Sequence, residues 1–455
     1  MTNKNNTHTQ KIKPFAYFIV MFAGLGGMLY GYDIGVISGA LLFMQHSIQL
    51  SDTELSTIVA AVLGGGAIAT LITGYLADRF GRRTMITSAS AIFIVGVILL
   101  IFSTSYAMLL SARLIQGIGI GIITIIIPLY LAETAPSSIR GRSVTVFQLF
   151  LTGGILLAFL IDLAFTQTGN WRGMFACVLA PGVLLFIGSF FLTKSPRWLY
   201  SQGQLKEALI ALRKSQSDEE AKHDIEEMRN TNVNGSNTTI MQFFHAVTQR
   251  NHFIPFLIAL AVASLNQLTG INSILQFVTL ILHSTGLSSE FVSMLGSVGV
   301  GLINFIVTII ALSLIDKIGR KPLLIIGTAG TVVALFFSGY ICTWTDSLLK
   351  GELLTLGLFV FIFFFAIGPG VVVWLVLSEL LPMSIRSKGM AICLFVNSAI
   401  SAILASIFLI MAHRLGFQSV FWLCGSCTIL YFLLAMYALP ETKNKTLEEI
   451  EIGFH

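Results

Sequence analysis

The short sequence Asp78-Arg-Phe-Gly-Arg-Arg83 returns in the second half of the chain as Asp316-Lys-Ile-Gly-Arg-Lys321. Each copy is a charged stretch between two long apolar runs, so each is expected to be a short loop that joins two membrane-spanning helices. A loop that recurs with its glycine and its basic pair in place indicates duplication. The repeat therefore predicts that the chain is built from two related halves.

Apolar runs on both sides of these loops fill most of the chain. Of its 455 residues, 55% are apolar and 11% are charged, whereas soluble proteins carry about a quarter charged residues. A helix needs about 20 apolar residues to span the hydrocarbon core of a bilayer. We therefore expect an all-α integral membrane protein with twelve spanning helices, at residues 15–43, 54–77, 84–103, 107–134, 142–165, 172–193, 253–283, 289–315, 322–344, 352–381, 389–412 and 417–439.

A second pair of residues supports the duplication. Glu133 and Arg140 return with the same spacing as Glu379 and Arg386. Six helices repeated in parallel are typical of transporters that expose a central site to each side of the membrane in turn. We expect a tail at 1–13, a six-helix bundle at 14–193, a linker with short cytoplasmic helices at 194–251, a second bundle at 252–440 and a tail at 441–455.

The basic residues predict the orientation of the chain. Most of its 27 lysines and arginines lie in the tails, in the central stretch and in every second loop, while the other loops hold only Arg172, Lys350 and Arg414. Loops rich in lysine and arginine stay in the cytoplasm, so both termini are predicted to be cytoplasmic. The formal net charge of +5 is thus interpreted as a topology signal, and no nucleic acid is expected as a partner.

Other classes of function find no support in the sequence. The five cysteines all lie within apolar runs and are interpreted as small buried hydrophobic residues, not as a metal or redox site. We find no nucleophile–base pair, no metal-ligand cluster and no phosphate-binding loop, so no enzyme, metal or cofactor is expected. The short loops and tails favour a bacterial inner membrane, and we expect a functional monomer in the lipid bilayer.

A series of motifs along residues 15–452 gives the chain a family likeness. The motifs are Gly31-Tyr-Asp33, Ser38-Gly39, Gly74 to Arg83, Arg113 with Gly117, Gly119 and Gly121, Tyr130 to Glu133, Arg140-Gly141, Asn266 to Asn272, Gly368-Pro-Gly370 with Trp374 and Glu379, and Pro440 to Lys443. The chain resembles the sugar porter family of the major facilitator superfamily, which includes bacterial proton–sugar symporters and animal glucose facilitators. The resemblance implies the major facilitator fold and a sugar as substrate.

Asp33 is the candidate proton-coupling residue. It lies midway along an apolar helix, where an ionised carboxylate costs several kcal/mol. Arg113 is the basic residue well inside the apolar runs of the first half, and we expect it to pair with Asp33. In proton-coupled sugar porters an acidic residue at the matching position is the proposed proton carrier. The alternative is a permanent ion pair that only holds the two helices together.

Charged residues at the cytoplasmic ends of the helices are expected to form a latch. Carboxylates and arginines at matching points of the two halves can pair when this side is sealed and separate when it opens. The alternative is a set of charges that only fixes the topology. The candidate latch residues are Asp78, Arg82, Glu133 and Arg140 in the first half and Asp316, Arg320, Glu379 and Arg386 in the second.

Amide side chains within the apolar helices are candidates for sugar binding. An amide donates and accepts hydrogen bonds at once, as recognition of sugar hydroxyls requires, and a tryptophan offers a flat apolar surface for the ring. Singly, such amides more often join helices. The candidates are Gln148, Asn266, Gln267, Asn272, Gln276, Asn304, Trp374 and Asn397, and the resemblance implies that Gln148, Gln267, Asn272, Asn304 and Trp374 line a central cavity.

The chain departs from the family pattern at several of these positions. Asn266 stands where a glutamine is usual, Gln276-Phe277 replaces two tyrosines, and Ser398 replaces a tryptophan of the glucose facilitators. Lys194 also stands where the family carries a glutamate. These changes alter the size and polarity of the expected cavity, so a hexose, a pentose and a polyol such as inositol stay open as substrates.

These observations together predict a secondary active transporter. We expect it to import a monosaccharide or related polyol by proton symport through alternating access, with the proton as coupling ion. A facilitative sugar uniporter is the main alternative, and Asp33 argues against it. A sugar sensor that does not transport is a further alternative.

Overall fold

The computed structural model describes residues 13–136, 140–234, 247, 250–285, 287, 289–382 and 385–443. Its helices are α1 (Pro14–Ile48), α2 (Asp52–Phe80), α3 (Arg82–Ile101), α4 (Tyr106–Thr134), α5 (Arg140–Phe165), α6 (Trp171–Ala176), α7 (Leu179–Ser189), α8 (Pro196–Ser201), α9 (Leu205–Ser215), α10 (Asp218–Asn234), α12 (Arg250–Leu268), α13 (Ile271–Ser284), α14 (Glu290–Ile318), α15 (Arg320–Cys342), α16 (Leu348–Ile367), α17 (Pro369–Leu380), α18 (Arg386–Leu415) and α19 (Phe417–Tyr437).

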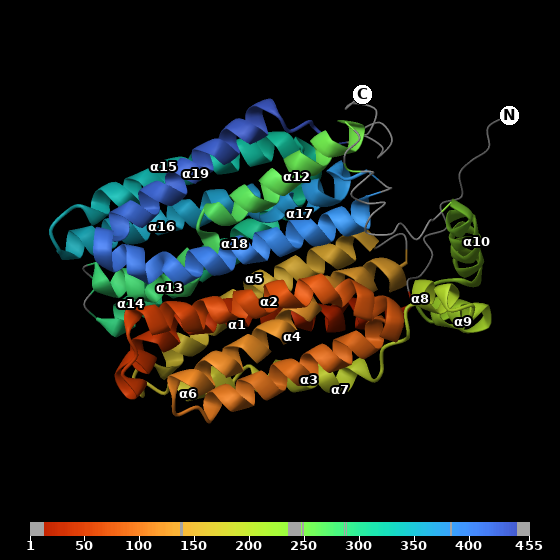
Figure 1. Cartoon of the computed structure of the whole chain (residues 1–455), viewed down its shortest axis with the longest axis horizontal. Helices are drawn as coiled ribbons and strands as arrows, with labels where there is room; N and C mark the ends of the chain where they lie inside the picture. The colour runs from red at the N-terminus through yellow and green to blue at the C-terminus, as the bar shows by residue number, and fades with distance from the viewer. Residues whose placement is uncertain are drawn as a thin grey trace.

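The helices form two bundles that lie side by side, α1–α7 in one and α12–α19 in the other (Figure 1). In the described part of the chain, 12 segments are long and apolar enough to cross a membrane. This number confirms the prediction from hydropathy. Helices are the expected solution, because backbone groups that face lipid must find their hydrogen-bond partners within the same segment.

Three predicted spans are interrupted in the structure. The span predicted at 172–193 consists of α6 and α7, 253–283 of α12 and α13, and 352–381 of α16 and α17. Gly270, between α12 and α13, has φ 83° and ψ 8°, a left-handed conformation that favours glycine. At the break between α16 and α17, Gly368 precedes Pro369. Proline has no backbone N–H, so it cannot donate the hydrogen bond that would continue α16. The three predicted spans are therefore confirmed as spans, but the sequence predictions did not include these interruptions.

The closest helix packing in the first bundle joins α1 to α5. A Cβ atom on Gly27 would lie 2.3 Å from the carbonyl oxygen of Phe147, and one on Gly31 would lie 1.8 Å from that of Leu151. These glycines are four residues apart and therefore on one face of α1. Small residues at such spacing let the backbones of two membrane helices approach each other, and here they hold α1 and α5 as one unit.

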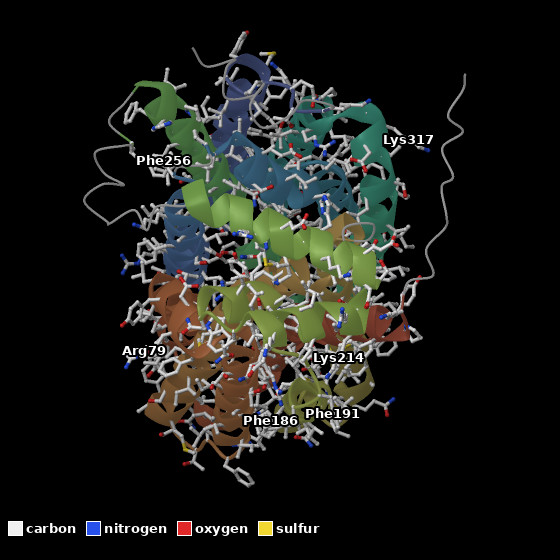
Figure 2. All side chains as sticks on the ribbon, turned by 90° about the vertical axis from the view of Figure 1, so that its right-hand side faces the viewer. Arg79, Phe186, Phe191, Lys214, Phe256 and Lys317 are labelled. Carbon is white, nitrogen blue, oxygen red and sulfur yellow. The ribbon has the colours of Figure 1, made fainter. Side chains whose placement is uncertain are left out.

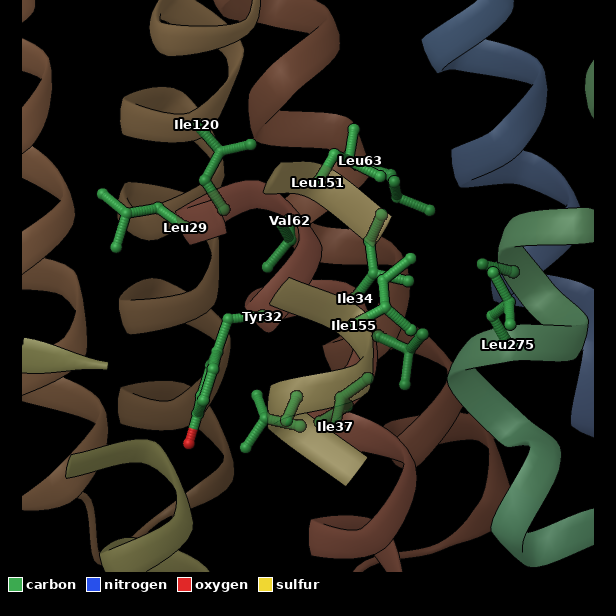
Figure 3. Packing of buried hydrophobic residues seen from close by; sticks show 14 of the residues in the cluster. Leu29, Tyr32, Ile34, Ile37, Val62, Leu63, Ile120, Leu151, Ile155 and Leu275 are labelled. Atoms are coloured by element: carbon green, nitrogen blue, oxygen red, sulfur yellow. The ribbon is translucent and has the colours of Figure 1, made fainter. Parts of the chain in front are cut away.

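Buried apolar side chains fill the space around this unit. Figure 3 shows Ile34 of α1 and Ile155 of α5 on the side that faces Leu275 of α13, while Tyr32 points away from α13. Ile155 and Tyr32 each expose only 1% of their surface. The α1–α5 unit therefore lies between the interior of its own bundle and the second bundle.

The two ends of the molecule differ. One end, called the proximal end here, carries the first and last described residues and the short helices α8–α10 (Figure 1). Figure 2 looks at this end and shows the basic residues Arg79, Lys214 and Lys317 there. The opposite, distal end carries the connections between α1 and α2 and between α18 and α19. Basic side chains from both bundles and from the stretch between them thus lie at the proximal end.

Candidate functional site

An ion pair lies deep inside the first bundle. Asp33, in the middle of α1, and Arg113, in the first half of α4, are 1% and 0% exposed. The Arg113 Nη1 atom donates to Asp33 Oδ1 at 2.6 Å and to Gln116 Oε1 at 3.1 Å. The guanidinium also lies 5.6 Å from the centre of the Phe175 ring, a distance typical of a cation–π contact. The structure therefore places together the two charged residues that the sequence predicts as partners.

This ion pair is incompletely hydrogen-bonded. Among the described residues, no hydrogen-bond partner is found for three buried atoms, Asp33 Oδ2 and the Nε and Nη2 atoms of Arg113. A buried ion pair is stable when further hydrogen bonds satisfy its remaining atoms. The pair between Asp33 and Arg113 lacks this support, so its attraction is offset in part by the desolvation of both groups.

Polar side chains gather around the break between α12 and α13. Gln267 Nε2 donates to Asn397 Oδ1 at 3.1 Å, and Asn397 Nδ2 donates to the Ala263 carbonyl at 2.8 Å. On the other side of the break, Asn272 Nδ2 donates to Ser401 Oγ at 3.0 Å. Four of the predicted amides therefore lie on or beside this break, since Asn266 directly precedes Gln267.

Several of these buried amides keep unused hydrogen-bonding atoms. Asn266 is 3% exposed and Gln267 is 6% exposed, and in the part of the chain that the structure describes Asn266 Oδ1 and Gln267 Oε1 have no partner. Gln276 is fully buried, and neither its Oε1 nor its Nε2 has a partner among the same residues. Buried polar atoms are normally hydrogen-bonded. A group of unpaired donors and acceptors on one pair of helices is the arrangement expected of a site for a polar ligand.

The remaining predicted binding residues lie apart from this hydrogen-bonded group. Gln148 is on α5, Asn304 on α14 and Trp374 on α17, and within the described residues none of their side chains hydrogen-bonds to the amides around the break. Trp374 is 37% exposed. Phe277 is buried and stacks on Phe408 with ring centres 4.9 Å apart, so it packs against α18 and does not contribute a polar group.

Two contributors to this region are absent from the sequence predictions. The Tyr30 side chain of α1 interacts with Asn272 of α13. Ser401 of α18 accepts a hydrogen bond from the side-chain amide of Asn272. A tyrosine or serine in an apolar helix carries no pattern of its own, and contact depends on how the helices are rotated against each other. Only the position of Tyr30 near Asp33 could have suggested it.

The distal ends of the two bundles are joined by polar contacts. The Ser38 and Thr279 hydroxyls are 2.8 Å apart, and the Thr279 amide donates to Ser38 Oγ at 3.0 Å. Thr279 also bonds to Ser297 of α14 at 2.8 Å. At the surface, His413 Nδ1 lies 3.2 Å from Asp52 Oδ2. These contacts connect α1 and α2 to α13 and α18, so they hold the distal end closed.

Charged clusters lie at the proximal ends of both bundles. Arg82 contacts Asp78 at 3.1 Å and Glu133 at 2.9 Å, and Ser195 donates to the same glutamate. In the second bundle Arg320 contacts Asp316 at 3.3 Å and Glu379 at 3.2 Å, and Thr442 donates to Glu379 at 2.6 Å. Each cluster joins helices of one bundle. The side chains of Arg140 and Arg386 lie outside the described part of the structure.

The chain is similar to known transport proteins over almost its whole length. A family profile described as "Sugar (and other) transporter" matches residues 19–454. The probable metabolite transport protein CsbC of Bacillus subtilis is 36% identical over 96% of this chain and 94% of its own length. The galactose-proton symporter of Escherichia coli strain K12 is 31% identical over 96% and 94%. A solved structure of the proton:xylose symporter XylE with 6-bromo-6-deoxy-D-glucose has a TM-score of 0.81 and 28% identity, covering 97% of this chain and 99% of that one.

Proposed function

The chain belongs to the sugar transporter family, and on this premise we propose that it imports a monosaccharide or a related polyol together with a proton, by alternating access between its two bundles. The observation that carries the proposal is a pairing of two features. A buried, incompletely satisfied ion pair lies in one bundle, and unpaired buried amides lie in the other. The first suits proton coupling and the second suits a substrate rich in hydroxyl groups.

The substrate site is proposed to lie between the bundles, around the break at Gly270. Gln267, Asn272, Gln276 and Asn397 provide amides from α12, α13 and α18, and Asn266 adds a further one. Gln148, Asn304 and Trp374 are proposed to complete the site from the facing helices as the bundles move. The unpaired atoms of Gln267 and Gln276 support this assignment, because a sugar hydroxyl can both donate to an amide oxygen and accept from an amide nitrogen.

Asp33 is proposed to carry the coupling proton. When Asp33 is ionised, its attraction to Arg113 holds α1 to α4. Protonation removes the charge of Asp33, so the ionic attraction that holds α1 to α4 is lost, while Arg113 keeps its bond to Gln116. A substrate-loaded, protonated carrier can change conformation more readily than an unprotonated one, which couples the two fluxes. Similarity to proton symporters for galactose and xylose supports this role.

The proximal end is proposed to face the cytoplasm of a bacterium, with the protein in the inner membrane as a functional monomer. The gathering of basic residues at this end supports the orientation. The domains are proposed to be a bundle at 14–193, a cytoplasmic linker at 194–251 and a bundle at 252–440, flanked by cytoplasmic tails. The proximal clusters around Arg82 and Arg320 are then the latch that seals the cytoplasmic side.

Uptake by proteoliposomes tests the proposal. The purified protein is reconstituted and offered radiolabelled hexoses, pentoses and inositol, with and without an inward proton gradient. We expect at least one of these compounds to accumulate above its external concentration, and only when the gradient is present. Equilibration without accumulation would identify a uniporter. Binding of a sugar without any uptake would identify a sensor.

A further inference from the structure

A second buried carboxylate lies in the first bundle, and the proposed mechanism does not use it. Asp162, near the distal end of α5, is 2% exposed. Its Oδ2 accepts a hydrogen bond from the backbone amide of Gly39 at 3.1 Å, while its Oδ1 has no partner within the described residues. In the described part of the structure no basic side chain pairs with Asp162. An ionised carboxylate in such a place costs several kcal/mol.

The surroundings of Asp162 are tightly packed. A Cβ atom on Gly39 would lie 2.5 Å from Asp162 Oδ2, so α1 packs directly against the carboxyl at this glycine. Two titratable side chains interact with it electrostatically, Tyr32 of α1 and Cys177 after α6. Neither is a cation that would offset a negative charge on Asp162.

Asp162 is coupled by position to the contact that closes the distal end. Its hydrogen-bond donor, Gly39, directly follows Ser38, and Ser38 binds Thr279 of the second bundle at 2.8 Å. For the distal end to open, this contact between Ser38 and Thr279 must break. Water from the distal side then reaches the segment of α1 against which the Asp162 carboxyl packs.

We propose that Asp162 is a proton-dependent lock on the distal end. When this end opens, Asp162 exchanges a proton with the distal solution. The end closes only when the carboxyl is neutral, because closing removes water from it and supplies no cation. On reopening, the O–H bond breaks and the proton returns to the same solution. The lock therefore makes closure depend on distal pH without moving a proton across the membrane.

This inference rests on the proposed transport cycle, but it assigns Asp162 and Asp33 different roles. The proton on Asp33 crosses the membrane with the substrate. The proton on Asp162 is bound and released on one side. Loss of Asp162 should therefore change the pH dependence of closure and leave the driving force for accumulation unchanged.

A distance measurement tests the lock without any substrate. Thr53 and Leu415 are exposed at the distal ends of α2 and α18, and nitroxide labels on T53C and L415C in an otherwise cysteine-free protein report the opening of this end. The ion pair between Asp52 and His413 crosses the same end and also responds to pH. All variants are therefore made in an H413Q background and measured in liposomes between pH 5 and pH 9.

With Asp162 present, we expect the ratio of open to closed protein to rise by up to about tenfold per pH unit, as one obligatory proton requires. Asp162→Asn should lower that slope by the equivalent of one proton. Tyr32→Phe, the matched control at a neighbouring titratable group, should keep the slope. Asp162→Ser, which also lacks a titratable proton, replaces the asparagine variant if the latter does not fold. Equal slopes with and without Asp162 would overturn the proposal.

Transport separates the lock from the coupling role. Asp162→Asn should reach the same proton-driven accumulation ratio as the wild type for a panel sugar. If accumulation is lost while exchange of the sugar persists, Asp162 carries a transported proton and the lock is wrong. If the wild type accumulates no panel sugar, the proposed function fails, but the distance measurement still decides whether the lock exists.

Discussion

At the scale of single residues, the Asp33–Arg113 pair has the features of a switch. Both side chains are buried, yet only one short contact joins them and three of their polar atoms have no partner. Removing one member of a buried ion pair is strongly destabilising when the other keeps its charge. Protonation of Asp33 in place is a smaller change, because the neutral carboxyl can still accept a hydrogen bond from Arg113.

Asp33→Asn should therefore abolish accumulation of the sugar and spare exchange. Asparagine cannot bind the coupling proton, but its amide oxygen can still accept from Arg113, so the bundle stays folded. Proteoliposomes preloaded with unlabelled sugar measure exchange, and an inward proton gradient measures accumulation. Glu290→Gln, which removes an exposed carboxylate at the distal end of α14, is the control and should keep both activities. Full proton-driven uptake by the Asp33 variant would remove this residue from the mechanism.

Gln276→Leu should weaken substrate binding and stabilise the empty protein. Both amide atoms of Gln276 are buried without a partner, and such a group costs about 1–3 kcal/mol. Leucine has a similar size and removes that cost. Each hydrogen bond lost to the substrate is worth about 1 kcal/mol, so KM should rise about fivefold.

Two measurements check this prediction, thermal unfolding of the detergent-solubilised protein and the KM for uptake. Gln418→Leu is the matched control, because Gln418 is a half-buried amide at the distal end of the second bundle, away from the break at Gly270, and its Nε2 donates to the Leu415 carbonyl. Its KM should stay at the wild-type value. A Gln276 variant that is less stable and binds sugar normally would show that the amide serves the fold.

The sequence predicts a contact correctly where a charged residue lies in an apolar helix and has few possible partners. Asp33 and Arg113 stand out because a charge in an apolar helix has few possible partners, and the structure places them in contact. Asp162 is also a carboxylate in an apolar span, but no basic residue in the sequence stands out as its partner, and its contact with Gly39 depends on the rotation of α5 against α1. The same holds for Ser38 and Thr279. Hydropathy predicts that a helix spans the membrane but not which face it turns to its neighbour.

At the scale of helices, the sequence predicts the spans better than their interruptions. The length of an apolar run is set by the bilayer, so twelve runs give twelve spans. The break at Gly270 depends on a single residue with positive φ. Glycine is frequent throughout these helices, with 41 in the chain, and the sequence does not distinguish a glycine that breaks a helix from one that allows close packing.

Gly31→Ala should separate α1 from α5. A Cβ atom at this position would lie 1.8 Å from the Leu151 carbonyl oxygen, and the contact is between two backbones that cannot rotate away. Overpacking of this kind costs about 1–3 kcal/mol, so the temperature of unfolding should fall and transport should be lost or slowed.

Gly64→Ala is the matched control for this experiment. Gly64 lies within α2, and a Cβ atom there would meet no neighbouring atom within 4 Å. Alanine is the better helix former by about 1 kcal/mol, so this variant should be as stable as the wild type or more so. Equal unfolding temperatures for the two variants would show that α1 and α5 can move apart without loss.

At the scale of the whole molecule, the two bundles carry corresponding charged clusters at the proximal end. Ser195 donates to Glu133 in the first bundle, as Thr442 donates to Glu379 in the second. Lys194, which precedes Ser195, and Glu441, which precedes Thr442, therefore stand at corresponding positions of the two bundles.

Glu441 and Lys194 act in opposite ways at this place. The Glu441 carboxylate accepts from the backbone amides of Arg320 and Lys321 at 3.1 Å each, which caps the first turn of α15 and suits the helix dipole. Lys194 instead lies with its Nζ 5.8 Å from the centre of the Trp198 ring, and among the described residues no side chain accepts from the first amides of α3 as Glu441 does at α15. The cluster of the first bundle thus lacks one of the contacts that support the second.

Lys194→Glu should therefore strengthen the proximal cluster of the first bundle. A carboxylate at the N-terminus of α3 is worth up to about 1 kcal/mol, so the ratio of proximal-closed to proximal-open protein should rise about fivefold.

The reactivity of a cysteine introduced at Thr145, near the proximal end of α5, measures this equilibrium and should fall in the Lys194→Glu variant. Glu133→Gln, which removes the carboxylate that Arg82 contacts, should raise the cysteine's reactivity. Glu441→Gln, which weakens the cap on α15 in the other bundle, should also raise the reactivity. If Lys194→Glu leaves the equilibrium unchanged while Glu441→Gln shifts it, the two clusters are not equivalent, and only the second bundle's cluster controls the cytoplasmic seal.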